Sequence, residues 1–159
     1  MPRISFSLNS KSIDTALKQL KSYQTKVHNA GENLTSELVD RGVEIAKNEA
    51  MYMNAYDSGE LVSGIIGKKN GERGSVQATA PHSAYVEFGT GVRGAQSPHP
   101  EPGLAGWKYD VNEHGEEGWW YWKNGEWHWT AGMQSRPYMY NTAKQLKQLV
   151  EPLAKEVLK

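Results

Sequence analysis

The chain has no cysteine, no net charge and no long apolar run, and each absence removes a class of protein. The missing cysteine excludes disulfides and thiolate metal sites. Basic and acidic residues number 18 each, so the basic excess of a non-specific nucleic-acid binder is missing. No apolar run approaches the roughly 20 residues of a membrane span, and the opening MPRISFSLNSKS lacks the apolar centre of a signal peptide. The 159 residues predict a single domain, residues 1–159, with no membrane and no export.

Motifs that carry catalysis or bind cofactors are also missing. The chain has no G-x-S-x-G, P-loop or EF-hand pattern, and none of its five histidines form an H-x-x-x-H pair. Glu87, between Tyr85 and Phe88, is the most catalytic-looking carboxylate, and His82 is its nearest acid–base partner in sequence. No second carboxylate or nucleophile accompanies them. We therefore expect no enzyme, no cofactor and no metal, with Glu87 in a buried or interfacial hydrogen-bonded contact.

An apolar repeat at helical spacing occupies the first third of the chain. Apolar residues recur at steps of three, four or seven, and their phase continues across Gly31: Ile13, Leu17, Leu20, Val27, Leu34, Leu38 and Ile45. This predicts one long helix, or two nearly collinear ones, from about Ser12 to about Ala55. We expect the apolar face formed by these residues to pack on the protein's own sheet, or also on a neighbouring subunit. Ahead of it, Ile4–Leu8 alternates weakly, as a strand does.

Two β-rich stretches and a last helix follow. Glu60–Lys68 and Ser75–Ala80 flank a turn containing Asn70-Gly71, a pattern typical of a hairpin. The last helix is expected to be capped by Ser135, with Pro137 in its first turn and a kink or break at Pro152. The order predicts an α+β fold, in which a long N-terminal helix and a C-terminal helix pack on a small antiparallel sheet.

A tryptophan-rich run, GWWYWKNGEWHWT, lies within residues 95–134, which we interpret as an insertion. Asn124-Gly125 is a favoured pair for a two-residue type I′ turn because both positions need positive φ. Counting outward predicts four cross-strand pairs: Lys123 with Glu126, Trp122 with Trp127, Tyr121 with His128, and Trp120 with Trp129. Four indoles then share one face, with Trp119 on the other. Gly106–Val111 also alternates and could add a third strand.

The indoles allow three interpretations. They can stabilise the hairpin by stacking on one another, which the pairing pattern favours most, or they can form a protein-contact surface. Stacking on sugars or nucleic-acid bases is the third, and it needs exposed ring faces. The run also looks like a cell-wall or choline-binding repeat, but such repeats come in arrays and here there is one copy.

Charge is unevenly distributed along the neutral chain. Residues 92–135 hold three basic and six acidic side chains, whereas residues 136–159 hold five basic and two acidic ones. Segments of opposite sign could pair within the chain or between subunits.

Three short motifs, in this order, resemble one family. They are DSGELVSGI, then HSAYVEFGTG, and then SRPYMYNTAKQL at the start of the last helix. In this combination the chain resembles the tail-completion or head–tail joining ("neck") family of long-tailed bacteriophages, over roughly Ile13 to Val157. Pro152 departs from the family pattern in the last helix. Aromatic insertions between the Gly-Thr and Arg-Pro blocks look familiar from phages of Gram-positive hosts.

The resemblance implies a virion part that catalyses nothing. Members join head to tail or complete the tail as rings, so the implied partners are copies of this chain, other neck proteins, and tail-terminator or tail-tube proteins. The implied location is the virion neck or tail, assembled in the host cytoplasm, with no sequence-specific nucleic acid. The motif residues carried over as interface or structural are Tyr85, Val86, Glu87, Phe88, Gly89, Thr90, Gly91, Arg136, Pro137 and Tyr138.

Within these motifs the residue types suggest a local structure. Gly89 and Gly91 permit positive φ and close backbone approach, so EFGTG is expected to form a closing turn. Tyr85, Val86 and Phe88 would pack on the sheet or the last helix. Arg136 is expected to pair with Glu87 and so to tie both ends of the insertion together.

Overall fold

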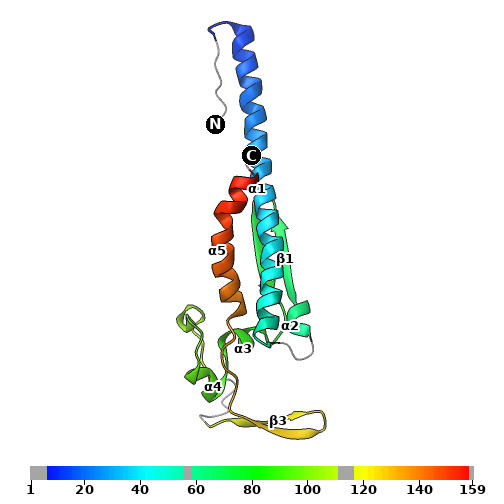
Figure 1. Cartoon of the computed structure of the whole chain (residues 1–159), viewed down its shortest axis with the longest axis vertical. Helices are drawn as coiled ribbons and strands as arrows, with labels where there is room; N and C mark the ends of the chain where they lie inside the picture. Colours follow the sequence, from blue (N-terminus) through cyan, green and yellow to red (C-terminus); the bar gives the residue numbers. More distant parts are fainter. Residues whose placement is uncertain (1–6, 56–58, 111–116, 158–159) are drawn as a thin grey trace.

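One long helix organises the molecule. The computed structural model describes residues 7–55, 59–110 and 117–157. Helix α1 (Ser10–Tyr52) spans much of the long axis, and its N-terminal half projects beyond the other elements (Figure 1). Asn9 begins it, since Asn9 Oδ1 accepts a hydrogen bond from Ser12 N at 2.9 Å. Of the two predicted alternatives, one long helix or two nearly collinear ones, the structure shows one helix that continues across Gly31.

The remaining elements follow the order expected of an α+β fold, and that fold class is confirmed. After α1 come α2 (Glu60–Ser63), β1 (Ile65–Asn70), β2 (Arg73–Ala78), α3 (Ser83–Phe88) and α4 (Gly91–Gln96). A 3-10 turn η1 (Pro102–Ala105), the strands β3 (Trp119–Lys123) and β4 (Glu126–Thr130), and helix α5 (Tyr138–Val157) complete the described chain. β1 pairs with β2 and β3 with β4, both antiparallel, as two separate sheets.

The C-terminal half of α1 packs against β1, β2 and α5 through a face of small residues. Val39, Gly42, Ala46 and Ala50 are the buried members of this face. A Cβ added to Gly42 would lie 2.6 Å from Val76 Cγ2 and 2.9 Å from Leu146 Cδ1, so the sheet and α5 both close on α1 at this point. Glu49 on α1 accepts hydrogen bonds from Asn141 Nδ2 and Gln145 Nε2 of α5, at 3.0 and 2.7 Å.

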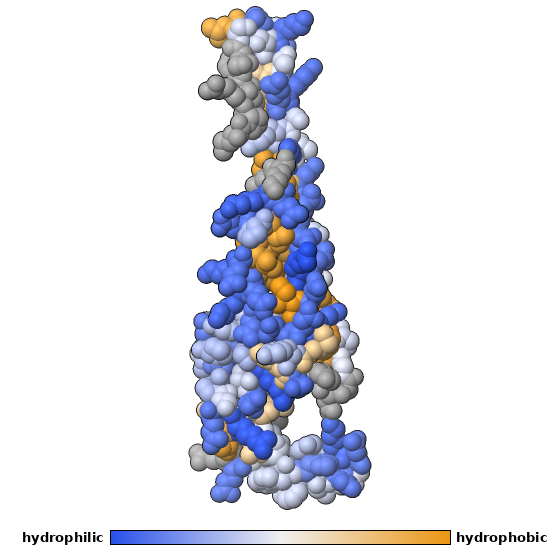
Figure 2. All heavy atoms as spheres, in the orientation of Figure 1, coloured by the Kyte–Doolittle hydropathy of each residue, from blue (hydrophilic) through white to orange (hydrophobic). Residues whose placement is uncertain are grey.

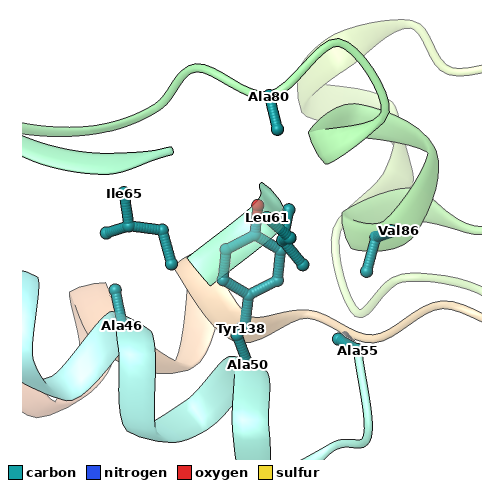
Figure 3. Packing of buried hydrophobic residues seen from close by; sticks show 8 residues of the cluster. All are labelled: Ala46, Ala50, Ala55, Leu61, Ile65, Ala80, Val86 and Tyr138. Atoms are coloured by element: carbon teal, nitrogen blue, oxygen red, sulfur yellow. The ribbon is translucent and has the colours of Figure 1, made fainter. Parts of the chain in front are cut away.

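The core centres on Tyr138, at the start of α5. Figure 3 shows its ring surrounded by side chains from α1, α2, β1 and the loop and helix that follow β2. The cluster consists of Ala46, Ala50, Ala55, Leu61, Ile65, Ala80, Val86 and Tyr138. Leu61, Ile65 and Tyr138 are almost completely buried. The end of α1, the hairpin and the start of α5 are therefore joined in one apolar centre.

The helical repeat correctly predicted the extent of α1 but not its buried face. The deepest residues are the small ones named above, whereas Leu34, Leu38 and Ile45 are only half-buried. Further towards the N-terminus, Ile13, Leu17, Leu20 and Val27 are exposed. Small residues are buried because they allow the neighbouring backbones to approach closely, and the larger ones line the edge of this contact.

Several local expectations need correction. Glu60–Ser63 forms a helical turn instead of the start of a strand, and β2 ends at Ala78. The residues of Gly106–Val111 that the structure describes form no third strand, and Val111 lies outside the described residues. α5 continues through Pro152 to Val157. Ile4–Phe6, most of the suggested first strand, also lie outside the described residues.

Candidate functional site

The two family-like motif segments meet in space although about 45 residues separate them. The block around Tyr85–Gly91 and the segment leading into α5 form one connected junction, held mainly by backbone bonds. Arg136 N donates to Val86 O at 2.9 Å, and Ser135 Oγ donates to Glu87 O at 2.6 Å. Thr90 and Met133 exchange backbone hydrogen bonds as an isolated antiparallel bridge. Both ends of residues 95–134 are thereby tied together.

Glu87 is the centre of this junction because it caps α5 from outside the helix. Its carboxylate is buried, and its two oxygens accept hydrogen bonds from Met139 N and Tyr140 N, each at 2.9 Å. These are N–H groups of the first helical turn, which have no partner inside the helix. A carboxylate at this position also interacts favourably with the positive end of the helix dipole.

His99 is the side-chain partner of Glu87. Its Nε2 lies 3.1 Å from Glu87 Oε1, and its Nδ1 accepts a hydrogen bond from Glu101 N at 2.9 Å. Because Nδ1 is an acceptor, the ring proton is on Nε2, which therefore donates to the carboxylate. The sequence analysis missed this partner. A buried carboxylate requires donors, but nothing in the spacing distinguishes His99 from the other histidines.

Aromatic rings cover the Glu87–His99 pair. Phe88 packs on His99 with ring centroids 4.6 Å apart and stacks on Trp107 at 5.2 Å. Tyr140 contacts the His99 ring edge to face, with ring centroids 5.3 Å apart. Trp107 Nε1 donates to Gly89 O at 2.9 Å. Of the three residues expected to pack on the sheet or the last helix, Val86 does so in the core cluster with Tyr138. Tyr85 instead contacts Trp107, with ring centroids 5.6 Å apart, and Phe88 packs on His99 and Trp107.

Two glycines permit this close assembly, as predicted. Gly89 has φ 81° and Gly91 has φ 61°. A Cβ at Gly89 would lie 2.7 Å from Ser135 N, and one at Gly91 would lie 2.7 Å from Ala131 O. The sharp turn therefore brings the Gly-Thr-Gly backbone directly against the returning strand.

The predicted Glu87–Arg136 pair is wrong. Glu87 is already bound by His99 and two backbone N–H groups, and Arg136 Nε is buried without a hydrogen-bond partner in the described part of the chain. Ser135 does not cap α5, since its hydroxyl binds Glu87 O and the helix starts three residues later at Tyr138. The motif arginine contributes its backbone N–H to the junction instead of its charge.

Tyr138 completes the junction from the core side. Its hydroxyl is buried and meets no hydrogen-bond partner with good geometry in the described part of the chain, and the neighbouring Ser83 Oγ donates to Ala78 O at 3.3 Å. Burial raises the pKa of the Tyr138 phenol, and the nearby Glu87 carboxylate raises it further. In the folded protein the Tyr138 phenol therefore stays protonated at pH values well above the ordinary pKa of tyrosine.

The polar groups of the junction bind one another. Glu87, the carboxylate with the most catalytic appearance, uses both oxygens to hold α5 and His99, and His99 uses both ring nitrogens. His82, the partner considered from the sequence, lies 3.9 Å from Glu60 instead. Within residues 7–55, 59–110 and 117–157, no group of three or more His, Cys, Asp or Glu side chains is placed to hold a metal ion. The same residues include no helix long and apolar enough to cross a membrane.

The tryptophan hairpin has the predicted register in every pair. Trp120 pairs with Trp129, Tyr121 with His128, Trp122 with Trp127, and Lys123 with Glu126. Asn124 and Gly125 both have positive φ, at 54° and 88°. The two tryptophan pairs meet edge to face, with ring centroids 5.5 and 5.4 Å apart. We call Trp119–Thr130 the ribbon, and it projects across the end of the molecule opposite the N-terminal half of α1 (Figure 1).

The exposure of the ribbon bears on the interpretations that the sequence left open. The four paired indoles are 51–63% exposed, whereas Trp119, on the other face, is half-buried. A two-stranded ribbon has no second layer, so each indole contacts its partner on one side and solvent on the other. We call Trp120, Trp122, Trp127 and Trp129 the indole face.

A second exposed apolar surface lies on the projecting half of α1. Its residues are 39–51% exposed: Ile13, Leu17, Leu20, Tyr23 and Val27. We call these residues the N-terminal stripe. Figure 2 shows apolar residues of the visible face gathered along the middle of the molecule, over α1 and α5, whereas the ribbon end is pale to blue. The pale colour reflects the intermediate hydropathy of tryptophan and does not mean that the ribbon lacks apolar area.

Comparison of the chain with protein-family models, with curated proteins and with solved structures finds no match to any of them.

Proposed function

We propose that the chain is a structural subunit of a long-tailed bacteriophage or prophage virion, where it joins head to tail or completes the tail as part of a ring. The observation that carries the proposal is the pair of exposed apolar surfaces at opposite ends of the molecule, the N-terminal stripe and the indole face. Contiguous apolar patches mark contact sites in soluble proteins. A ring subunit at the neck needs contacts on more than one side.

The motif junction supports the same proposal. Two of the three segments that resemble the neck family, the block around Tyr85–Gly91 and the segment leading into α5, bind each other through their backbones, so these two parts of the resemblance fall on one structural unit. Glu87 and His99 are fully engaged in hydrogen bonds within that unit. In the described residues the junction therefore offers a scaffold for residues 95–134 and no free acid–base pair.

The test is complementation of virion assembly. The gene is deleted from the phage or prophage that carries it, and particles are counted by electron microscopy with and without the chain supplied in trans. We expect unjoined heads and tails in its absence and joined particles in its presence. Normal particle formation without the chain would overturn the proposal.

A matched variant addresses the ribbon. Replacing Trp119–Thr130 by two glycines keeps Gly118 and Ala131 close, because Trp119 and Thr130 are paired neighbours across the ribbon. We expect a folded chain that fails to restore joined particles. Normal assembly with this variant would remove the ribbon from the proposed contact.

The exposed indoles also favour a second candidate, a carbohydrate or cell-wall binding module. Sugar stacking needs accessible ring faces, and the four paired indoles have them. Tryptophan fluorescence during titration with choline, chitin fragments and peptidoglycan separates the two functions. The assembly proposal predicts no saturable shift, whereas a saturable shift at micromolar ligand would favour the binding module.

A further inference from the structure

Two arginines line one polar pocket beside the junction. The pocket lies between α4 and the segment that leads into α5, and its volume is about 360 Å³. Its lining consists of Arg93, Gln96, Ser97, Met133, Gln134 and Arg136. Among these described lining residues two are cationic and none is acidic, so the lining carries a charge of +2. Neither arginine forms an ion pair in the part of the chain that the structure describes.

Backbone hydrogen bonds hold the two walls of this pocket together. Arg93 N donates to Ala131 O at 3.1 Å, and Ser135 N donates to Ser97 O at 3.1 Å. Each bond joins α4 or the residue after it to the segment that leads into α5. A site whose walls are fixed before binding loses little conformational freedom when a ligand binds. The pocket therefore has the preformed shape of a binding site.

Arg136 brings a buried donor to the pocket. Its side chain is half-buried, and its Nε is buried without a hydrogen-bond partner among the described residues. A buried charged donor without an acceptor costs more free energy than a neutral one. Glu87 does not accept from it, because the Glu87 carboxylate is bound to His99 and to backbone N–H groups of α5. Water can accept from Nε, but a neutral molecule does not offset the two charges of the lining.

The donors of this pocket match a phosphate group. A guanidinium presents a planar fork of N–H groups that fits the oxygens of phosphate or carboxylate. A phosphate monoester carries about −1.5 to −2 charges at pH 7 and so offsets both arginines, whereas a single carboxylate offsets only one. The amides of Gln96 and Gln134 and the hydroxyl of Ser97 add neutral donors to the same lining.

We infer that this pocket binds a phosphate group, held by Arg93 and Arg136 between α4 and the segment leading into α5. Two sources supply such a group: inorganic phosphate or a phosphate monoester in solution, and the backbone of a nucleic acid. A ligand that binds only the folded chain stabilises it, so a bound phosphate strengthens the junction. The inference uses only the side chains of the pocket and does not rest on the proposed function.

Titration of the full chain with inorganic phosphate at constant ionic strength tests the pocket. The Nε–H groups of arginine give their own signals in a proton–nitrogen correlation spectrum, so the buried donor of Arg136 can be observed directly. We expect this signal to shift and saturate, with a dissociation constant of about 1 mM or lower. Sodium acetate at the same ionic strength should bind more weakly, because it carries one charge.

Arg136→Lys and Arg93→Gln are the pocket variants. Arg136→Lys keeps the charge and removes the fork of N–H groups, whereas Arg93→Gln removes one of the two charges. Each should weaken phosphate binding about 10-fold or more, measured on the backbone signals of Gln96 and Ser97. Circular dichroism checks that both variants keep the helix content of the wild type.

Arg73→Gln is the matched control. Arg73 is exposed at the start of β2 and does not line the pocket. The substitution lowers the net charge of the chain by the same amount as Arg93→Gln. Its phosphate affinity should equal that of the wild type, because specific binding depends on the pocket and not on the total charge.

A short DNA duplex distinguishes the two sources of the phosphate group. Displacement of inorganic phosphate by the duplex in the wild type, with weaker displacement in Arg136→Lys, would assign the site to a nucleic-acid backbone. An Arg136 signal that keeps its phosphate-bound position in the presence of the duplex would assign it to free phosphate or a monoester. Either result supports a phosphate site.

Three results would contradict the inference. They are an Arg136 signal that does not saturate with phosphate, acetate binding as tight as phosphate binding, and pocket variants that bind no more weakly than Arg73→Gln. The complementation test of the proposed function counts particles and measures no phosphate. A failure of either proposal therefore leaves the other standing.

Discussion

The two hairpins have the same local design and opposite surroundings. Both are antiparallel ribbons with a two-residue loop, Gly71-Glu72 between β1 and β2 and Asn124-Gly125 between β3 and β4. The first lies on α1 and presents Ile65, Gly67, Gly74 and Val76 to it. Within the described residues, no helix lies against the tryptophans of the second hairpin. Hairpin geometry therefore arises from local turn chemistry, whereas its stabilisation comes from different sources in the two cases.

Side-chain size follows from this difference. Where a helix backbone lies close, the strand carries glycine, because a Cβ at Gly67 would lie 2.5 Å from Val39 Cγ1. Where no helix covers the strands, the chain places indoles that stabilise the ribbon by contacting one another. The first hairpin depends on its fit to α1, and the second depends on its own cross-strand pairs.

The largest effect is expected from Gly67→Val in the first hairpin. Valine favours strands, so local propensity predicts stabilisation. The added side chain overlaps Val39 and comes within about 3.2 Å of Val43 Cγ2, however, and both neighbours are β-branched. We expect a loss of roughly 3 kcal/mol or more in the free energy of unfolding, measured in urea.

Gly103→Ala is the control for that substitution. A Cβ at Gly103 meets no atom within 4 Å. The free energy of unfolding of Gly103→Ala should therefore stay close to that of the wild type. Equal stability of Gly67→Val and Gly103→Ala would show that the first hairpin does not depend on its fit to α1.

The next largest effect is expected from Glu87→Gln, at the junction that ties the segment bearing the ribbon to the body. The substitution removes the charge that accepts three hydrogen bonds, and the new amide NH₂ faces at least one N–H donor. We expect a loss of about 2–3 kcal/mol in the free energy of unfolding.

Arg136→Ala is the comparison at the same junction. Arg136 forms no ion pair with Glu87, so the substitution should cost less than Glu87→Gln. If both variants lost the same free energy of unfolding, and if the double mutant showed strong coupling between the two positions, the Glu87–Arg136 ion pair suggested by the sequence would be supported after all.

Tyr138→Phe is expected to have a smaller effect, of the opposite sign. It removes a buried hydroxyl that has no hydrogen-bond partner among the described residues, and it keeps the ring at the centre of the core. At neutral pH we expect stability to be unchanged or higher by roughly 1 kcal/mol. A clear loss of stability would show that the hydroxyl has a partner.

The pH dependence of stability, compared between the wild type and Tyr138→Phe, gives a second measurement. The raised pKa of Tyr138 means that the unfolded chain loses this proton near the ordinary tyrosine value of about 10 while the folded chain keeps it. Wild-type stability should therefore be fully present below that pH and fall as pH rises above it. The slope should be less steep in Tyr138→Phe, since the other tyrosines are common to both proteins.

The smallest effect on global stability is expected from Trp122→Ala in the ribbon. Edge-to-face indoles should give exciton-coupled circular dichroism, and the variant should retain only the contribution of Trp120 and Trp129. The ribbon should lose about 1 kcal/mol or less of local stability, with little change in the melting temperature of the body. Trp119→Ala should keep the signal, since Trp119 lies on the opposite face. A signal unchanged in Trp122→Ala would exclude the paired indoles as its source.

Features set by neighbours in sequence were predictable. The ribbon register follows from one Asn-Gly pair and from counting, and the alternation that places four indoles on one face follows from strand geometry. The continuity of α1 across Gly31 follows from the phase of its apolar repeat. The positive φ of Gly89 and Gly91 follows from glycine in a tight turn.

Features set by distant neighbours were not predictable. The sequence pointed to the large residues of α1 as its core face, yet Gly42, Ala46 and Ala50 are buried more deeply because β2 and α5 approach there. The sequence analysis paired Glu87 with Arg136 because their charges are opposite. In the structure, the donors to the Glu87 carboxylate are two backbone N–H groups of α5 and His99.

The sequence by itself thus determined the long first helix, the ribbon register and the sharp turns, because each depends mainly on torsion angles and hydrogen bonds within a few residues. Only the tertiary structure decided which apolar residues are covered and which remain exposed, since burial depends on what packs opposite a side chain. The same leucine spacing along α1 is half-buried beside α5 and exposed beyond its end. The indoles of the ribbon are exposed for the same reason, because no second layer from the part of the chain that the structure describes lies against them.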